Sequence, residues 1–320
     1  MEVFLHASTQ MLILFTIVAL GALARKKGFM NDQFDTILSK LVMTIAVPGM
    51  ILDSVLGNDN LPGSETILQV LLYSAVMYVG ICVFAWIMVR FVYRGVPRAA
   101  KGAHAFLIAF GNTGFIGFAV IAGIMGDDAV LYAAIYNIPY NLAMFSVGIL
   151  FIMYSGESTS TSRRGIKGVA LIIGRQLVNP CMIACFVAMF LAIFGFTDSG
   201  YIGTTCEYIG QLTVPAAMLV TGSTLIKQPF KDMVSDGWSY VTTFCRLLAV
   251  PLLLFAIGSL FIQDSYILSI IVLETGMPAA SSGIMLSLAY GGDTRVMARG
   301  TFLTTLLSII TIPIVALIVI

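Results

Sequence analysis

Charged side chains are scarce in this sequence. Asp, Glu, Lys and Arg make up 10% of its 320 residues, whereas 59% of the residues are hydrophobic. A soluble domain carries about 25% charged residues and needs polar side chains to cover its core. The mean hydropathy of +0.98 reflects the same shortage of polar surface. The composition therefore excludes an ordinary soluble protein and predicts a chain whose exterior lies mostly in lipid.

Residues that carry enzyme chemistry are also few. The chain has two histidines, His6 and His104, and no G-x-S-x-G run, so a serine nucleophile would have little choice of base. Tyr290-Gly-Gly-Asp293 is similar to the G-x-G-D motif of intramembrane aspartyl proteases but lacks its first glycine. We therefore expect no enzyme activity and no bound cofactor.

The cysteines and the net charge exclude two further classes. The five cysteines are odd in number, no pair has C-x-x-C spacing, and no histidine lies near Cys181 and Cys185. This pattern predicts buried free thiols and no metal site. The net charge is +1 and the chain has no long run of Lys and Arg, so a nucleic-acid partner is not expected.

Long runs without charge predict the membrane spans. A transmembrane helix needs about 20 mostly apolar residues, and no charged residue occurs between Lys101 and Asp127 or between Arg299 and the C-terminus. The predicted fold class is an all-α polytopic membrane protein with ten transmembrane helices. The expected spans are residues 4–24, 36–56, 67–90, 102–125, 129–154, 169–195, 205–226, 238–261, 265–290 and 297–319.

Lys and Arg orient these spans. All of them lie in or near the loops that follow odd-numbered spans, whereas the alternate loops hold acids such as Asp127 and Asp264. Cytoplasmic loops of membrane proteins are rich in Lys and Arg, so both termini are expected outside the cytoplasm. The first basic cluster, Arg25-Lys-Lys27, follows the first apolar run, which argues against a cleavable signal peptide.

The two halves of the chain share three landmarks in the same order. They are Pro48 and Pro215, Asn112-Thr-Gly114 and Glu274-Thr-Gly276, and Gly126-Asp127 and Gly292-Asp293. Their offsets of 167, 162 and 166 residues are close to half the chain length. Five spans per half would make the second half enter the membrane from the opposite side, as in the inverted repeats of secondary transporters. The expected division is a first repeat at 1–155, a cytoplasmic linker at 156–166 and a second repeat at 167–320.

Spans four and nine are expected to be broken near the membrane midplane. Span four reads Phe110-Gly-Asn-Thr-Gly-Phe-Ile-Gly117, and span nine contains Pro278. Glycine and asparagine disfavour a helix, and proline clashes with the carbonyl four residues earlier. Two such breaks should cross inside the protein and aim half-helix N-termini at an anion. The alternative is that the glycines only let helices pack closely.

Polar residues on spans four, five and nine are the candidates for substrate contact. The predicted substrate-binding residues are Asn112, Thr113, Gly114, Asn137, Tyr140, Asn141, Glu274, Thr275, Gly276, Met277, Pro278 and Ser281. For Asn137 and Asn141, which share a helix face, hydrogen bonding between helices is the alternative. Pro48 and Pro215 are expected to kink spans two and seven beside the cavity.

Of the charged residues inside predicted spans, Glu274 and Arg246 are the candidates for a functional role. Ionisable groups at membrane depth are expensive and usually functional, so Glu274 is expected to couple a proton, coordinate a cation or pair with a basic group, unless it lies nearer an aqueous edge. Arg246 is expected to snorkel toward the cytoplasmic interface. Contact with the substrate or with Glu274 is the alternative for Arg246.

Taken together, these motifs resemble those of the auxin efflux carrier family, including its bacterial members. The resemblance rests on the span four run, Thr213-Val-Pro215, Met277-Pro-Ala-Ala280 and Tyr290-Gly-Gly-Asp293. It implies two inverted five-helix repeats similar to those of sodium/proton antiporters, and an anion site beside the crossing of helices four and nine. Asn112 and Pro278 match crossover positions of the family. Where its members often have a proline in helix four, this chain has Phe118.

The resemblance also implies a function and a location. The function it implies is that of a secondary transporter of a small organic anion, such as malate, malonate, lactate or an auxin-like acid. The location it implies is the bacterial cytoplasmic membrane. Expected partners are that anion, a coupling proton or sodium ion and the lipid bilayer, with a homodimer left open. A sodium- or proton-coupled carrier of another substrate class, bile-acid-like or for cation exchange, is the alternative, because one architecture serves all of these.

Overall fold

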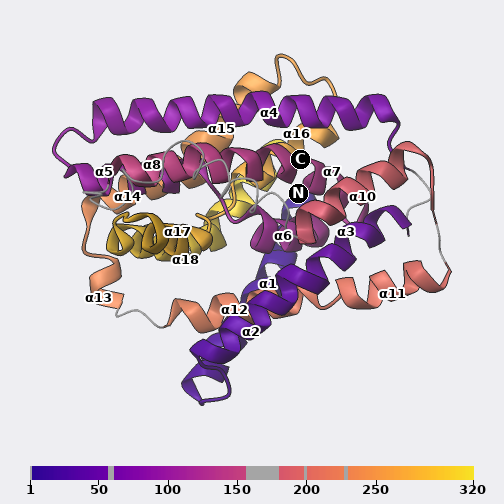
Figure 1. The fold of residues 1–320 in the computed structure, drawn as a ribbon, viewed down its shortest axis with the longest axis horizontal. Helices are drawn as coiled ribbons and strands as arrows, with labels where there is room; N and C mark the ends of the chain where they lie inside the picture. Colours follow the sequence, from indigo (N-terminus) through magenta and orange to yellow (C-terminus); the bar gives the residue numbers. More distant parts are fainter. Residues whose placement is uncertain (1, 57–60, 156–179, 198–199, 227–229) are drawn as a thin grey trace.

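The computed structural model describes residues 2–56, 61–155, 180–197, 200–226 and 230–320 as an assembly of helices (Figure 1). Within these residues the only β-type pairing is an isolated bridge between Gly111 and Ala279. In the first half of the chain the helices are α1 (Glu2–Lys26), α2 (Asp32–Leu41), α3 (Val47–Leu56), α4 (Ser64–Ile87), α5 (Arg98–Ala109), α6 (Phe118–Met125), α7 (Asp128–Ala143) and α8 (Ile149–Ser155). In the second half they are α10 (Pro180–Ile193), α11 (Tyr201–Gly210), α12 (Thr213–Leu225), α13 (Phe230–Met233), α14 (Gly237–Phe244), α15 (Val250–Gly258), α16 (Ser265–Thr275), α17 (Ser282–Tyr290) and α18 (Thr294–Val319).

Short π-helical turns join several of these helices into longer rods. They lie at Val42–Ala46, Met88–Val92, Thr113–Gly117, Met144–Gly148 and Cys245–Ala249. Each predicted span coincides, over its described length, with one helix or with consecutive helices. The predicted span at 169–195 is described only from residue 180, and the predicted linker at 156–166 lies outside the described residues.

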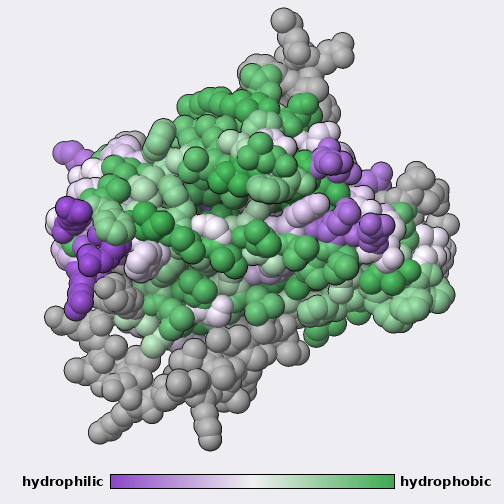
Figure 2. Space-filling view, turned by 90° about the horizontal axis from the view of Figure 1, so that it is seen from above, coloured by the Kyte–Doolittle hydropathy of each residue, from purple (hydrophilic) through white to green (hydrophobic). Residues whose placement is uncertain are grey.

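Among the described residues, five helical stretches are long and apolar enough to cross a membrane. They are Asp32–Leu56, Ser64–Val92, Asp128–Met153, Gly237–Gly258 and Thr294–Val319. On the face shown in Figure 2, hydrophobic residues form a broad central area, and the hydrophilic ones gather toward the two ends of the long axis. The chain is therefore an all-helical, polytopic membrane protein.

Acidic residues at the ends of the apolar runs set where several helices begin. Asp264 accepts hydrogen bonds from the backbone N–H groups of Tyr266 and Ile267, and Asp293 caps α18 in the same way. A side chain that caps an N-terminus satisfies donors that the helix itself leaves free. The charges that delimit the spans in the sequence thus also fix the helix boundaries.

One group of helices is held together by close glycine contacts. A Cβ on Gly21 of α1 would collide with the backbone of Leu219 in α12, and a Cβ on Gly222 of α12 would collide with that of Val18. At the packed pair α3 and α11, Gly210 lies directly against the backbone of Met50. Only glycine lets helix backbones approach this closely. Helices α1, α2, α3, α10, α11 and α12 form this first helix group, which includes the helices near the bottom of Figure 1.

The second helix group comprises α4 to α8 and α14 to α18. Within it α4 packs on α7, α5 on α8 and α18, and α15 on α16. The first group contacts the second through α1 against α6 and α18, through α3 and α10 against α7, and through α12 against the π-helical turn Thr113–Gly117. The breaks in the predicted spans four and nine therefore lie in the second group, beside its contact with the first.

Candidate functional site at two interrupted helices

Both interruptions expected from the sequence are present. Helix α5 ends at Ala109 and helical structure resumes at Thr113, while α16 ends at Thr275 and α17 begins at Ser282. The first break forms without a proline, where Phe110 is extended and glycine follows it. A Cβ on Gly111 would collide with the guanidinium of Arg246, so this close approach requires glycine.

The two breaks pair with each other in antiparallel fashion. The N–H of Asn112 donates to the carbonyl oxygen of Pro278 at 2.6 Å, and the N–H of Ala280 donates to that of Phe110 at 3.0 Å. Buried backbone groups need partners, and each break supplies them to the other. The crossing is thus a short two-stranded contact at the centre of the second helix group.

Arg246 holds the C-terminal ends of the two half-helices. Its side chain is fully buried, and it donates through Nε to the carbonyl oxygen of Met277 at 2.9 Å and through Nη1 to those of Ile108 and Ala109 at 3.2 and 3.1 Å. Carbonyls at a helix C-terminus carry partial negative charge. The expectation that Arg246 snorkels is wrong, because these carbonyls solvate the guanidinium inside the protein. The only sequence signal was its charge within an apolar run.

The N-terminal ends of the two half-helices are available to bind a substrate. The first N–H groups of a helix have no acceptor within that helix. No side chain caps the turn at Thr113–Gly117 or the start of α17. The Asn112 amide donates to the Ser281 hydroxyl at 3.4 Å, which links the two ends. Ser281 is exposed, and a Cβ on Gly114 would meet only open space. Gly114 and Ser281 are thus accessible, and the buried Asn112 is joined to them through its bond to Ser281. These three residues are here called the N-terminal edge.

Glu274 lies deep in the same region. Its side chain is fully buried, and neither carboxyl oxygen has a hydrogen-bond partner. Gly117 packs against it so closely that a Cβ there would collide with the carboxyl group. Among the described residues, no ion pair joins Glu274 to Arg246. Within the same residues, no three His, Cys, Asp or Glu side chains lie close enough together to hold a metal ion.

The other span nine candidates are buried. Thr275, Gly276, Met277 and Pro278 have little or no exposed surface, and the Thr275 hydroxyl donates to the Val272 carbonyl at 2.8 Å. These residues shape the break. Because they are buried, they would influence a bound substrate only indirectly, through the residues at the N-terminal edge.

The span five candidates support the first break. Thr113 donates to the Asn137 amide oxygen at 2.7 Å, and Tyr140 donates to the Gly111 carbonyl at 2.6 Å. The amide nitrogens of Asn137 and Asn141 donate to carbonyls one turn back in their own helix, at 2.9 and 2.7 Å. Each amide thus uses one of its two N–H donors within its own helix, and the contact across helices comes from Thr113. The sequence did not indicate this pairing, since Thr113 and Asn137 are 24 positions apart.

The two prolines lie in the first helix group. Pro48 follows the π-helical turn Val42–Ala46, and Pro215 stands in the first turn of α12, after a short irregular step from α11. Both are half-buried. A cavity of about 10 Å³ lies between α1, α6, α12 and α18, lined by residues that include Ile116 and Met218. This small volume shows that the two helix groups are closely packed there.

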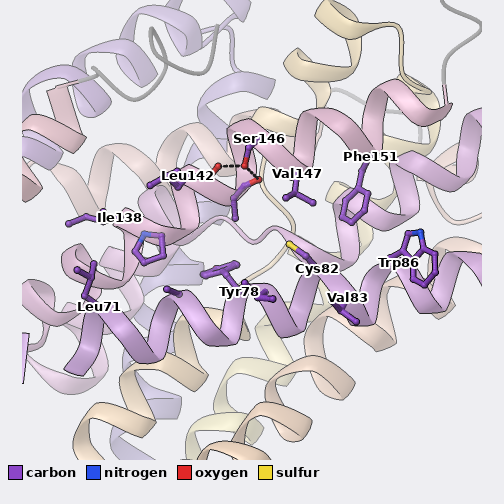
Figure 3. Close-up of a pocket in the computed structure, with 14 residues that line it drawn as sticks. Leu71, Tyr78, Cys82, Val83, Trp86, Ile138, Leu142, Ser146, Val147 and Phe151 are labelled. Atoms are coloured by element: carbon purple, nitrogen blue, oxygen red, sulfur yellow. Dashed lines mark hydrogen bonds between the residues drawn. The ribbon is translucent and has the colours of Figure 1, made fainter. Parts of the chain in front are cut away.

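A larger cavity lies elsewhere. It is an apolar groove of about 780 Å³ between α4 and the stretch from α7 to α8 (Figure 3). Its lining residues include no cation. The rings of Tyr78 and Tyr140 meet edge to face between the groove and the carbonyl of Gly111. Recognition of an anion needs donors or positive potential. The crossing, and not the groove, therefore carries the candidate site.

Comparison with known proteins agrees with a membrane carrier. The family described as "Membrane transport protein" matches residues 6–316. The chain is 25% identical over 312 residues to an uncharacterized transporter of Methanothermobacter thermautotrophicus, covering 97% of this chain and 98% of that protein. It is 27% identical over 309 residues to the transporter YfdV of Escherichia coli K12, covering 95% and 94%. It is 25% identical over 211 residues to a candidate malonate transporter of Rhizobium meliloti, covering 65% of this chain and 64% of that protein.

Proposed function

Because this chain belongs to the membrane transport protein family, which includes the auxin efflux carriers, we propose that it is a secondary transporter of a small organic anion. The observation that carries the proposal is that the C-terminal ends of the half-helices have a charged side-chain partner, whereas their N-terminal ends have none. Arg246 satisfies the C-terminal carbonyls, while the N-terminal ends face the edge of Asn112, Gly114 and Ser281. The edge therefore combines positive helix-end potential with helix starts that no side chain caps.

The shape of the edge suits a carboxylate. A carboxylate can accept from backbone N–H groups of the Thr113–Gly117 turn. It can also accept from the Asn112 amide or the Ser281 hydroxyl once the hydrogen bond between these two groups is broken. Phe115 is half-buried beside this edge and offers apolar contact to the rest of a small acid. The similarity to a candidate malonate transporter supports mono- and dicarboxylates as the substrate class.

The proposed mechanism is alternating access between the two helix groups. The second group holds the crossing, and the first group packs against it through α1 and α12. Relative movement of the groups would expose the N-terminal edge to one side of the membrane at a time. We also propose that the chain forms ten spans as two inverted repeats in the cytoplasmic membrane, with both termini outside, on the basis of the matched landmarks and the distribution of Lys and Arg.

A coupled carrier is the second candidate, and Glu274 favours it. A carboxyl group buried without a partner is costly and is seldom kept without a role. Under this proposal Glu274 takes up a proton or a sodium ion during the cycle. Counterflow of labelled substrate measured across a range of pH and sodium concentration tests it. An unchanged dependence in Glu274→Gln would remove the coupling role.

Substrate binding is tested on purified protein. A panel of mono- and dicarboxylates is screened for ligands that raise the thermal unfolding midpoint, since a ligand that binds the native state stabilises it. Counterflow of the strongest ligand in proteoliposomes then distinguishes a carrier from a channel. Asn112→Ala should lower affinity by about tenfold, as expected for the loss of a hydrogen bond to a charged group, while the unfolding midpoint without ligand stays within a few degrees.

The matched control is Asn141→Ala. Its amide belongs to the same helix bundle but donates to its own helix at Asn137. Equal losses of affinity in Asn112→Ala and Asn141→Ala would contradict an anion site at the N-terminal edge. Full affinity in a monodisperse Asn112→Ala protein would contradict it as well.

A further inference from the structure

The apolar groove beside α4 has the form of a trough. Small side chains, among them Ala75, Cys82 and Ala143, line it together with larger ones such as Trp86 and Phe151. Figure 3 shows Trp86 and Phe151 at one end, and Leu71 and Ile138 at the other. The Ser146 hydroxyl donates to the carbonyl of Leu142 in its own helix, so it leaves no free donor toward the groove. Its contents must therefore be apolar.

The groove faces the lipid. Val79 is 66% exposed and Trp86 is 53% exposed, and both belong to Ser64–Val92, one of the stretches long and apolar enough to cross a membrane. The opposite wall comes from Asp128–Met153, which is another such stretch. The surface that surrounds the groove therefore lies within the hydrocarbon core.

The groove is long enough for an acyl chain. Trp86 lies fifteen positions after Leu71, which is about 22 Å along the helix at about 1.5 Å per residue. One leaflet is only about 15 Å deep, half of a hydrocarbon core of about 30 Å. A lipid acyl chain that enters the groove moves from one apolar environment to another, so the acyl chain itself gives little selectivity among lipids. Any selectivity must come from the headgroup.

Two exposed arginines follow the end of the groove marked by Trp86. Arg90 stands four residues after Trp86, on the same side of the helix, and Arg94 lies in the turn that follows the end of this helix at Val92. The Arg90 guanidinium carbon lies 6.0 Å from the centre of the Phe91 ring, which holds it near the helix end. Arginine suits phosphate geometry, and basic residues beside a membrane helix attract anionic lipids.

From this combination we propose that the groove binds an anionic phospholipid, with one acyl chain between α4 and α7–α8 and its phosphate at Arg90 and Arg94. The complementarity of two cations at one end of an apolar trough selects this occupant over a second copy of the chain. The proposal is independent of the transported substrate, because the groove is separated from the crossing by Tyr78 and Tyr140.

Trp86 provides a direct test. The chain has two tryptophans, so Trp238→Phe leaves Trp86 as the single indole, and phenylalanine preserves a ring next to Tyr93, 4.8 Å from Trp238 in the native chain. This protein is reconstituted in phosphatidylcholine vesicles with increasing fractions of brominated phosphatidylglycerol or brominated phosphatidylcholine. Quenching of the Trp86 fluorescence reports a brominated chain in contact with the indole.

The expected result is stronger quenching by the anionic lipid. Each arginine should lower the half-quenching fraction of phosphatidylglycerol about fivefold relative to phosphatidylcholine. Arg90→Gln with Arg94→Gln should bring this ratio close to one, whereas Arg90→Lys with Arg94→Lys should keep most of it. Ala143→Leu, which places a larger side chain in the groove, should weaken quenching by both lipids.

Arg295→Gln is the matched control, since Arg295 at the start of α18 is also exposed but is not among the residues that line the groove. The control should leave the ratio unchanged. Equal quenching by the two lipids would overturn the proposal, and so would a ratio that survives the double glutamine variant. Absence of quenching by either lipid would show that something else, such as a second copy, covers the groove.

Discussion

The Arg246 side chain donates to the carbonyl oxygen of Met277 at 2.9 Å and thereby ties the π-helical turn Cys245–Ala249 to the break between α16 and α17. The same guanidinium bonds to Ile108 and Ala109 at the end of α5. A single fixed cation therefore serves the negative ends of both interrupted helices. The positive ends are left for a guest of opposite charge.

Replacement of Arg246 should destabilise the fold. Arg246→Met leaves three buried carbonyls without this donor, and each unsatisfied group costs about 1–3 kcal/mol. We expect a loss of at least about 3 kcal/mol, measured by denaturant unfolding in detergent. Arg246→Lys should lose less because it keeps the charge, but it lacks the planar fork. The exposed Arg295→Gln is the control, and equal stability of Arg246→Met and this control would contradict the assignment.

Two glycines of the same break should respond differently to alanine. Gly111→Ala places a Cβ against the Arg246 guanidinium and should cost about 1–3 kcal/mol through overpacking. Gly114→Ala meets open space, so its unfolding free energy should stay within about 1 kcal/mol of the parent or rise. Substrate affinity should instead fall in Gly114→Ala, because the methyl group occupies the N-terminal edge. Thermal unfolding and ligand titration of the two variants separate these effects.

Gly117 and Glu274 should be energetically coupled. A methyl group at Gly117 collides with the Glu274 carboxyl group, so Gly117→Ala alone should lose about 1–3 kcal/mol of unfolding free energy. In a Glu274→Ala background the space is free and the same substitution should have little effect. The double-mutant cycle measures this interaction directly. Additive effects of the two substitutions would mean that the contact is not made in the folded protein.

The carboxylates next to Arg25 provide a third matched pair. Asp35 is buried, lies 3.0 Å from the Arg25 guanidinium and accepts from the Ser223 hydroxyl, and it thereby links α1, α2 and α12. Asp32 lies 2.6 Å from Arg25, but its side chain is 76% exposed. Asp35→Asn should cost about 1–3 kcal/mol and Asp32→Asn less than about 1 kcal/mol. The thermal unfolding midpoints should fall in that order, and the reverse order would contradict the role of burial.

Local signals predicted the breaks well. Pro278 and the glycines near Asn112 interrupt their helices as their backbone preferences require. The acids that border the apolar runs, such as Asp264 and Asp293, became helix caps. These features depend on the residue itself and its near neighbours, so they are readable without the fold.

The partners of the site residues were not readable in this way. The Asn137 amide was a candidate for the substrate, yet its nitrogen donates within its helix and its oxygen accepts from Thr113. Arg246 gave no sign of where its donors would go, because its acceptors are backbone carbonyls at Ile108, Ala109 and Met277. Every residue has a carbonyl group, so no side-chain pattern marks the ones that an arginine will reach.

The sequence alone determined that this protein lies in a membrane, where its helices run and where two of them break, because hydropathy, glycine and proline act locally. Only the tertiary structure decided that the breaks pair with each other, that one buried arginine holds both C-terminal ends, and that an apolar groove beside α4 ends at two arginines. Those features join segments more than a hundred residues apart or depend on how two helices pack, and contact of that kind exists only once the chain has folded.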